Sequence, residues 1–258
     1  MQPANIDSVQ TSFSLQAAGF ERAEAGLSSA EWLDRARRAI APSAKDRVLE
    51  VCSGTCLMGR SLAPYVSHVT CIDATPAMLA EGKRLAAKAD LTNMEFQEGL
   101  AEELPYPDGT FDIVVTRLSF HHLVDAGDVF HEMERVLAPD GKLVVADMLS
   151  APEPLRDVRD SIEKMRDPSH ERCFSQEELE RFFHESGLHI QEERISHLPH
   201  ALSGWMDLTH TPQATQAEIE RLMKDELRGG KKTGFAPYRN SEGDIWFDQA
   251  WLLIVGTR

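Results

Sequence analysis

The sequence predicts an α/β fold in which a mostly parallel sheet is covered by helices on both faces. Three observations support this prediction. Strand-like and helical patterns alternate along the chain, as is typical of parallel α/β proteins. The segment from Arg47 to Asp73 has the order strand, tight turn, helix, strand. Phe111 to Val115 is an apolar run, as expected for a parallel strand that is buried on both faces.

Hydrophobic periodicity places the other elements in order. Helices are expected within Met1–Ala41 and at Met78–Lys88, Asp128–Leu137, Leu155–Met165, Ser175–Glu185 and Ala201–Arg228, and strands at His68–Ile72, Met94–Glu98, Lys142–Asp147, Leu188–Ile195 and Asp244–Thr257. Thr75-Pro76 is a helix start, because threonine can cap free N–H groups and proline is tolerated in the first turn. Pro139 to Gly141 is expected to be a turn, and Ser175 with Glu178 a capping box.

Length and composition limit the classes of function. With 258 residues, 42% hydrophobic and 27% charged, the chain is long enough for one sizeable α/β domain with an elaboration. Its 42 acidic and 27 basic residues give a formal charge of −15, which disfavours a nucleic-acid partner. No apolar run approaches the roughly 20 residues that span a bilayer, and the start of the chain does not read as a secretion signal. We therefore expect a soluble, cytoplasmic protein without membrane or nucleic-acid partners.

The cysteine pattern does not indicate disulfides or a metal centre. The chain has four cysteines, Cys52, Cys56, Cys71 and Cys173. Without an export signal, these are expected to be reduced thiols. Cys52 and Cys56 lack the second pair of ligands that a structural zinc site needs. We predict no metal site.

The first turn and the acid that follows it predict a nucleoside-cofactor site. A strand containing Glu50 leads into the loop from Cys52 to Cys56, and a helical pattern follows. Asp73 ends the next strand roughly 20 residues after the turn, the offset at which a neighbouring parallel strand presents an acid to ribose hydroxyls. The alternative is an ordinary crossover turn that binds nothing.

These residues resemble motif I of the class I S-adenosylmethionine (SAM)-dependent methyltransferases. The motif is an acid followed by three glycines at alternate positions, and this chain has Glu50-Val51-Cys52-Ser53-Gly54-Thr55-Cys56 in its place. Only Gly54 of the three glycines is kept. This departure matters because glycine lets the backbone approach a ligand without a Cβ in the way.

The resemblance covers nearly the whole chain, and it is strongest to the small-molecule methyltransferases of the ubiquinone/menaquinone-biosynthesis type. It implies a Rossmann-like sheet of seven strands with a reversed last strand, SAM as cofactor and a small-molecule substrate. Within a single domain spanning residues 1–258, it assigns 1–42 to an N-terminal helical lid, 43–150 to the cofactor-binding core, and 151–258 to a substrate cap and the C-terminal strands. It leaves a homodimer open.

The same resemblance supplies most of the candidate site residues. The cofactor set is Glu50, Cys52, Gly54, Cys56, Asp73, Ala74, Leu100, Ala101 and Arg117. Leu100 stands where the family has an aspartate that accepts a hydrogen bond from the adenine amino group; leucine can pack on the ring but cannot accept that bond. Substrate contacts are expected from Phe13, Asp147 and His170, with packing, capping and solvation as the respective alternatives.

Two adjacent histidines, His121 and His122, follow the predicted central strand. Ligands of open α/β sheets bind beyond the carboxyl ends of the strands, and histidine is suited to act as a base near pH 7. Because neighbours in a turn point in different directions, we expect one histidine to act as the catalytic base or to position the substrate. The other is expected to bond to the backbone.

The sequence therefore predicts methyl transfer from SAM to an oxygen, nitrogen or carbon nucleophile of a small molecule. The alternative is an enzyme of the same fold that catalyses another reaction, such as a cyclisation or elimination, with SAM structural or absent. Cys56 and Leu100 favour that alternative. A non-enzymatic partner protein is disfavoured by Glu50, Gly54 and Asp73.

Overall fold

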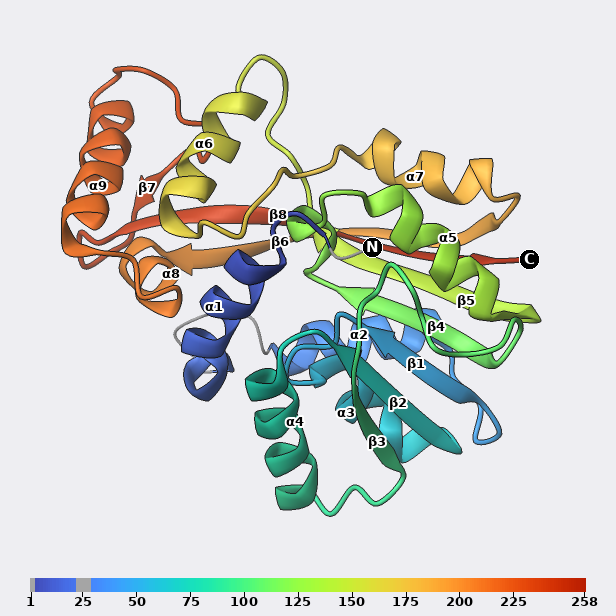
Figure 1. Ribbon diagram of the computed structural model, residues 1–258. Coiled ribbons are helices and arrows are strands. Elements are labelled where there is room, and N and C mark those ends of the chain that lie inside the picture. Colours follow the sequence, from blue (N-terminus) through green and yellow to red (C-terminus); the bar gives the residue numbers. More distant parts are fainter. Residues whose placement is uncertain (1–2, 22–28) are drawn as a thin grey trace.

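The computed structural model describes residues 3–21 and 29–258, which form a three-layer α/β/α core and a helical cap (Figure 1). The helices are α1 (Ile6–Gln16), α2 (Ala30–Ile40), α3 (Leu57–Leu62), α4 (Pro76–Lys88), α5 (Ala126–Val136), α6 (Arg156–Arg166), α7 (Gln176–Glu185), α8 (Leu202–Leu208) and α9 (Gln213–Leu227), with short 3-10 turns η1 (Ala17–Gly19), η3 (Ala63–Tyr65) and η4 (Phe120–His122). Residues 1–2 and 22–28 of the predicted lid lie outside the described residues. None of the described helices is long and apolar enough to cross a membrane.

A single sheet of eight strands runs through the described part of the chain. The strands are β1 (Arg47–Val51), β2 (His68–Asp73), β3 (Met94–Glu98), β4 (Phe111–Arg117), β5 (Leu137–Met148), β6 (His189–Ala201), β7 (Tyr238–Arg239) and β8 (Ile245–Thr257). Their order is β3-β2-β1-β4-β5-β8-β6, and β7 pairs with β8. The first five strands pair in parallel, whereas β8 is antiparallel to β5 and β6. This confirms the mostly parallel sheet with a reversed last strand; β7, two residues long, was not predicted.

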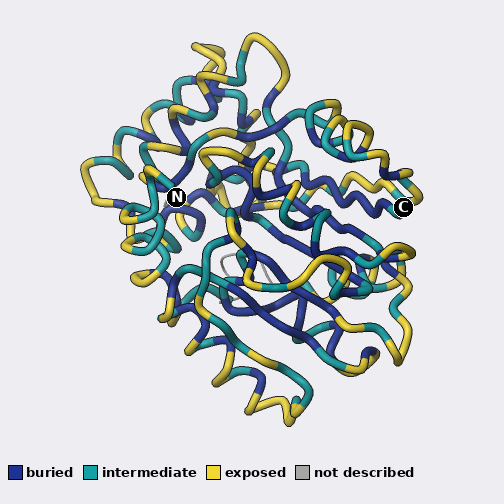
Figure 2. Tube along the Cα trace, turned by 45° about the vertical axis from the view of Figure 1, so that its right-hand side comes forward, coloured by how far each residue is buried: buried dark blue, intermediate teal, exposed yellow. Residues whose placement is uncertain are grey.

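The two faces of the sheet bury alternate side chains of each strand. Leu49 and Val51 of β1 belong to a core cluster with residues of α5 and α7. Val48, on the opposite face, belongs to a cluster with residues of α2, α3 and α4. Figure 2 shows the central strands as the buried interior of the molecule. The alternation follows from the two-residue period of a strand.

The cap is attached to the sheet by two long strands. β6 and β8 pair from His189 opposite Thr257 to Ala201 opposite Trp246, so β6 is longer than the predicted strand Leu188–Ile195. At their cap end, β6 leads directly into α8, and both strands lie near α6 and α9 (Figure 1). A separate apolar cluster fills this region: Ile162, Leu202, Trp205, Met206, Ile219, Met223, Phe235, Ile245 and Phe247.

Of three local predictions, two helix caps and one turn, the structure confirms one cap and differs at the other two positions. The Ser175 capping box is confirmed, with Glu178 N–H donating to Ser175 Oγ at 3.2 Å and Ser175 N–H donating to Glu178 Oε2 at 2.7 Å. The predicted Thr75 side-chain cap is wrong, because the Thr75 side chain forms no hydrogen bond that caps α4. The predicted turn at Pro139–Gly141 lies inside β5, where the pairing with β4 shifts register.

Gly82 allows α4 to pass close to the first turn of the sheet. A Cβ at this position would lie 2.7 Å from the backbone oxygen of Thr55 and 3.0 Å from Cys56 Sγ. Replacing a helical glycine by alanine usually stabilises a helix by about 1 kcal/mol. We expect Gly82→Ala instead to lower the melting temperature, measured by circular dichroism, because a backbone atom cannot move aside cheaply.

Gly127→Ala in α5 is the matched control. Its Cβ would meet only the Asp125 carboxylate at 3.3 Å and the Phe182 ring at 3.9 Å, so its melting temperature should be equal to or above that of the wild type. Equal melting temperatures for the two variants would contradict the close approach of α4.

Candidate functional site

A cavity lies beyond the carboxyl ends of β1, β2, β3 and β4, and α1 forms part of its wall. The predicted cofactor residues that line it are Glu50, Cys52, Gly54, Asp73, Ala74, Leu100, Ala101 and Arg117. Phe13 and His122 line it as well. The structure does not bring Cys56 to this cavity.

The backbone of the turn after β1 is left-handed at the retained glycine and at both cysteines. Cys52, Gly54 and Cys56 have φ angles of +51°, +53° and +61°, in the left-handed region that favours glycine. The Cys56 side chain is fully buried in the core cluster that contains Cys71. The Cys56 thiol therefore packs the turn against the core.

Glu50 joins β1 to α3. Its Oε2 accepts a hydrogen bond from Gly59 N–H at 2.6 Å. Burial raises the pKa of the Glu50 carboxyl to about 7, although the Gly59 N–H and the positive charges of Arg117 and Arg60 act to lower it. Because Glu50 also lines the cavity, its charge state responds to a cation placed there.

Asp73 shapes the turn from the neighbouring strand. Oδ2 accepts from Gly54 N–H at 2.7 Å, and Oδ1 accepts from Thr75 N–H at 2.8 Å. Burial raises the pKa of this carboxyl, and the two N–H groups oppose the rise. A carboxylate offers about four acceptor positions, so Asp73 keeps capacity for hydroxyl groups in the cavity.

The sequence analysis missed one acidic residue that lines this cavity. Glu102 lines the cavity two residues after Leu100, and burial raises the pKa of its carboxyl. The absence of the family's aspartate at Leu100 was the signal that could have prompted a search for a nearby acid.

A second cavity adjoins the first, and the two share Phe13, Phe20, Leu118 and His122 as wall residues. The rest of the second wall consists of Gln16, His121, Met148, Arg166, Asp167, His200, Trp205, Leu208, Gln249 and Trp251. Most of these residues come from the cap and from β8, which sequence analysis did not connect with the histidine pair. Because the two cavities share four wall residues, a molecule in the second cavity can approach one held in the first.

His121 is held by a buried carboxylate. Its Nδ1 lies 2.5 Å from Asp147 Oδ1, and Asp147 also accepts from the N–H groups of Phe120 and Met148, each at 2.7 Å. Burial acts against ionisation of Asp147, but the His121 charge and these hydrogen bonds outweigh it and keep the pKa of the carboxyl below its usual value. With Nδ1 engaged, Nε2 of His121 is left to take a proton. Asp147 itself lines neither cavity.

His122 has different partners. Its Nδ1 lies 3.1 Å from the backbone oxygen of Ser169 and 3.1 Å from Ser169 Oγ, and its ring packs edge-on against Phe13 with centroids 5.0 Å apart. Burial lowers the pKa of His122, and the charge of His121 lowers it further. His122 is therefore neutral in the folded protein at neutral pH.

Helix α1 connects the two sides of the site. Gln10 Nε2 donates to the backbone oxygen of Ala74 at 2.7 Å, on the cofactor side. Asn5 Nδ2 donates to the backbone oxygen of His122 at 2.8 Å. Ser12 Oγ donates to Asp167 Oδ1 at 2.8 Å, on the cap side. These bonds hold α1 across the junction of the two cavities.

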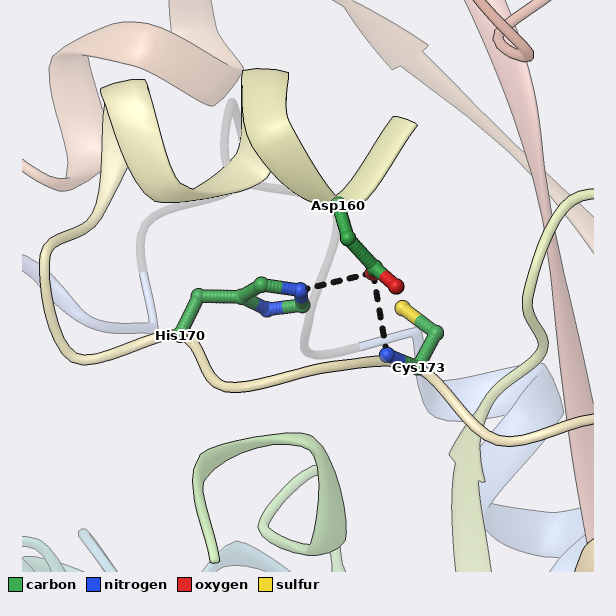
Figure 3. Close-up of side chains that lie close together, drawn as sticks. All are labelled: Asp160, His170 and Cys173. Carbon is green, nitrogen blue, oxygen red and sulfur yellow. Dashed lines mark hydrogen bonds and ion pairs between the residues drawn. The ribbon is translucent and has the colours of Figure 1, made fainter. Parts of the chain in front are cut away.

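His170 lies outside both cavities, in a group with Asp160 and Cys173 (Figure 3). Asp160 Oδ1 lies 2.9 Å from His170 Nε2 and accepts from Cys173 N–H at 3.0 Å. The three potential ligand atoms are within 4.8 Å of one another, a donor set that suits zinc. The sequence analysis had predicted no metal site. In the structure its hydrogen bonds tie the loop after α6 back to that helix.

Comparison with known proteins bears on this geometry. Residues 49–145 match the family described as "Methyltransferase domain". The chain is 30% identical over 216 residues to the uncharacterized methyltransferase YcgJ of Bacillus subtilis (strain 168), covering 83% of this chain and 85% of that protein. The crystal structure of YcgJ superposes with a TM-score of 0.80 at 28% identity, covering 89% of this chain and 99% of that one.

Two further proteins are similar over less of the chain or at lower identity. A demethylmenaquinone methyltransferase of Listeria monocytogenes serotype 4a (strain HCC23) is 39% identical over 104 residues, 39% of this chain and 44% of that protein. The [4+2]-cyclase SpnF superposes with a TM-score of 0.64 at 16% identity, covering 88% of this chain and 80% of that one. The similarity to SpnF concerns the fold alone.

The neutral state of buried His122 should make folding stability depend on pH. In the unfolded chain a histidine takes up a proton below a pKa of about 6.5, whereas folded His122 does so only at lower pH. The unfolded state then binds more protons, so the free energy of unfolding falls as pH is lowered from about 7 to about 5. We expect His122→Asn to make this fall shallower, measured by urea denaturation across that range.

His189→Asn, at an exposed position at the start of β6, controls for the loss of one histidine and should keep the slope of the wild type. An unchanged slope in His122→Asn would assign the pH dependence to another group.

Proposed function

This chain belongs to the SAM-dependent methyltransferase family, and on that premise we propose that it methylates a small molecule bound in the second cavity. The main support for this proposal is that the two cavities share wall residues, and that His122 lines both cavities. A cofactor in the first cavity and an acceptor in the second would meet at this wall.

The residues of the first cavity fit the parts of SAM. Asp73 has acceptor capacity for the ribose hydroxyls, and Glu50 with the turn to Gly54 would lie beside the methionine part. The guanidinium of Arg117, whose pKa burial lowers to about 10, is still charged at neutral pH and suits the methionine carboxylate. Leu100 and Ala101 would pack on adenine. We assign to Glu102 the acceptor role that Leu100 cannot fill.

When bound, SAM supplies an electrophilic methyl group. The protein holds the acceptor in line with that group and excludes water, and correct placement is the main source of rate in such a displacement. For an oxygen or nitrogen nucleophile, His121 Nε2 takes the proton while Asp147 stabilises the charged imidazole. His122, neutral and held by Ser169, positions the acceptor at the junction.

A cyclisation or elimination on the same fold has less support. Cys56, one of the two residues that favoured it, is buried in the core and does not line the cavity. The other, Leu100, has an acid close by in Glu102. The similarity to the cyclase is one of fold alone.

We also propose that residues 1–42 act as a lid, 43–150 as the cofactor core and 151–258 as the acceptor cap with the C-terminal strands. The hydrogen bonds from α1 to both Ala74 and Asp167 support the lid. His170 and Asp147 would support the acceptor site indirectly, through the loop after α6 and through His121. A cytoplasmic location and a homodimer stay predictions from the sequence.

Asp73→Ala should weaken SAM binding by about 1.5–3 kcal/mol, the range for hydrogen bonds to a charged group. The measurement is isothermal titration calorimetry with SAM. Because Asp73 also accepts from Gly54 and Thr75 N–H groups, the melting temperature is recorded to show that the variant is folded.

Glu98→Ala is the control for the loss of one carboxylate. Glu98 pairs with Asp73 at the same level of the sheet but is exposed and outside the cavity, so SAM affinity should not change. Unchanged affinity in the folded Asp73→Ala variant would remove Asp73 from the cofactor site.

His121→Asn should reduce turnover by about 10²–10⁴-fold, as expected for the loss of a general base, and leave SAM affinity unchanged. Asparagine keeps an N–H donor for Asp147 but has no counterpart of Nε2. The readout is S-adenosylhomocysteine formation across a pH series, and turnover should recover at a pH where the acceptor ionises without help.

His170→Asn is the matched control, since His170 also bonds to an aspartate but lies outside both cavities. Its turnover should fall much less. Equal turnover in the His121 variant and the wild type would mean that placement alone drives the reaction.

A further inference from the structure

Part of the wall of the second cavity carries hydrogen-bond donors without good acceptors. Trp251 lines the cavity and is 2% exposed, and its Nε1 has no hydrogen-bond partner among the described residues. An indole N–H can only donate, and a buried donor without an acceptor is destabilising. Such a group in a ligand cavity indicates an acceptor atom on the ligand.

Gln249 adds a second donor beside it. Residues two apart on a strand share a face, so Gln249 and Trp251 of β8 project to the same side, and both line the cavity. Gln249 is 4% exposed, and the partner of its Nε2 is the thioether sulfur of Met148. A thioether is a weak acceptor. The amide therefore gains from a ligand oxygen in its place.

Arg166 brings a positive charge to the same cavity. Its guanidinium lies over the Trp205 ring, 4.5 Å from the centroid, and its Nε has no hydrogen-bond partner within the described part of the chain. The nearest carboxylates, Glu163 and Asp167, lie at 3.9 and 4.0 Å, beyond hydrogen-bonding distance.

The neighbouring Asp167 does not cancel this preference for an acceptor. Its oxygens already accept from Ser12 Oγ, Gln16 Nε2, and the N–H and Oγ of Ser169. Its pKa is kept below the usual value, against the effect of burial, by the positive charge of Arg166 and by the Ser169 hydrogen bonds. The acid is thus satisfied within the protein. Among the described residues, Trp251 Nε1 and Arg166 Nε have no hydrogen-bond partner, and Gln249 Nε2 has only a thioether.

We propose that Trp251, Gln249 and Arg166 form a subsite for a carboxylate group of the methyl acceptor, in the same cavity as His121 and His122. This inference rests on the proposed methyl transfer, because it places the nucleophile at His121 and His122. Two neutral donors and a guanidinium match the acceptor capacity and charge of a carboxylate. The aromatic rings of Phe13 and Trp205 in the same wall suit a ligand with a flat aromatic body. The acceptor class is therefore a small hydroxylated or aminated aromatic acid.

The test measures ligand binding to the full chain saturated with S-adenosylhomocysteine, which prevents turnover. Four probes differ only in the group meta to a phenolic hydroxyl: hydroxybenzoate, hydroxyacetophenone, phenol and hydroxybenzylamine. We expect hydroxybenzoate to bind roughly tenfold or more tighter than phenol, the effect of a charge-assisted hydrogen bond. Hydroxybenzylamine should bind most weakly.

Trp251→Phe keeps the aromatic ring and removes the N–H, and it should lose most of the preference for hydroxybenzoate over phenol. Trp246→Phe is the matched control. Trp246 on the same strand also has a buried Nε1 without a partner in residues 3–21 and 29–258, but it lines neither cavity. It should keep the full preference. If Trp251→Phe is unstable, Gln249→Met gives the same test of a single lost donor.

Several results would overturn the subsite. Hydroxyacetophenone binding as tightly as hydroxybenzoate would mean that the donors bind a neutral carbonyl. Equal binding of hydroxybenzoate and phenol, or no binding of any probe, would mean that these donors form hydrogen bonds with water only and not with a ligand carboxylate. These outcomes are distinct from failure of the proposed function, in which SAM and S-adenosylhomocysteine do not bind, or SAM binds and no acceptor is methylated.

Discussion

The geometry of the site depends on one buried carboxylate. Asp147 is 2% exposed and accepts from the N–H groups of Ser119, Phe120 and Met148 as well as bonding to His121. A buried anion is stable only if donors surround it. Here the donors come from the end of β5 and from the turn that follows β4. Satisfying the charge therefore requires that turn to fold back over the strand ends, which is what brings the histidines to the junction of the cavities.

Much of the core was predictable because local rules govern it. The buried run of β4 and the alternating helices follow from hydrophobic period, and the geometry of a crossover unit determines the offset between the first turn and Asp73. Asp73 accordingly accepts from Gly54 N–H. Motif matching alone cannot tell which way a side chain points from a left-handed residue. Cys52 and Cys56 have similar φ angles, yet Cys52 lines the cavity and Cys56 enters the core.

The acceptor side was much less predictable, because it is built from segments far apart in sequence. Phe13, His121, Trp205 and Trp251 meet in one cavity although they come from α1, η4, α8 and β8. Their meeting depends on the register of β6 against β8 and on the path of α1 across the site. Neither the register of β6 and β8 nor the path of α1 corresponds to a short sequence motif. The histidine pair was identifiable only because it follows a recognisable central strand.

The long pairing of β6 with β8 has a consequence for how such a protein can diversify. One end of β8 belongs to the central sheet, and the other supports the cap and part of the acceptor wall. The acceptor wall is thus held by backbone hydrogen bonds between β6 and β8, which tolerate many side chains. The turn after β1, which belongs to the cofactor cavity, lies on another part of the sheet. Substitutions on the cap and at exposed positions of β6 and β8 can accumulate without disturbing cofactor binding. Such an architecture permits substrate range to drift over evolutionary time while the source of the methyl group stays constant.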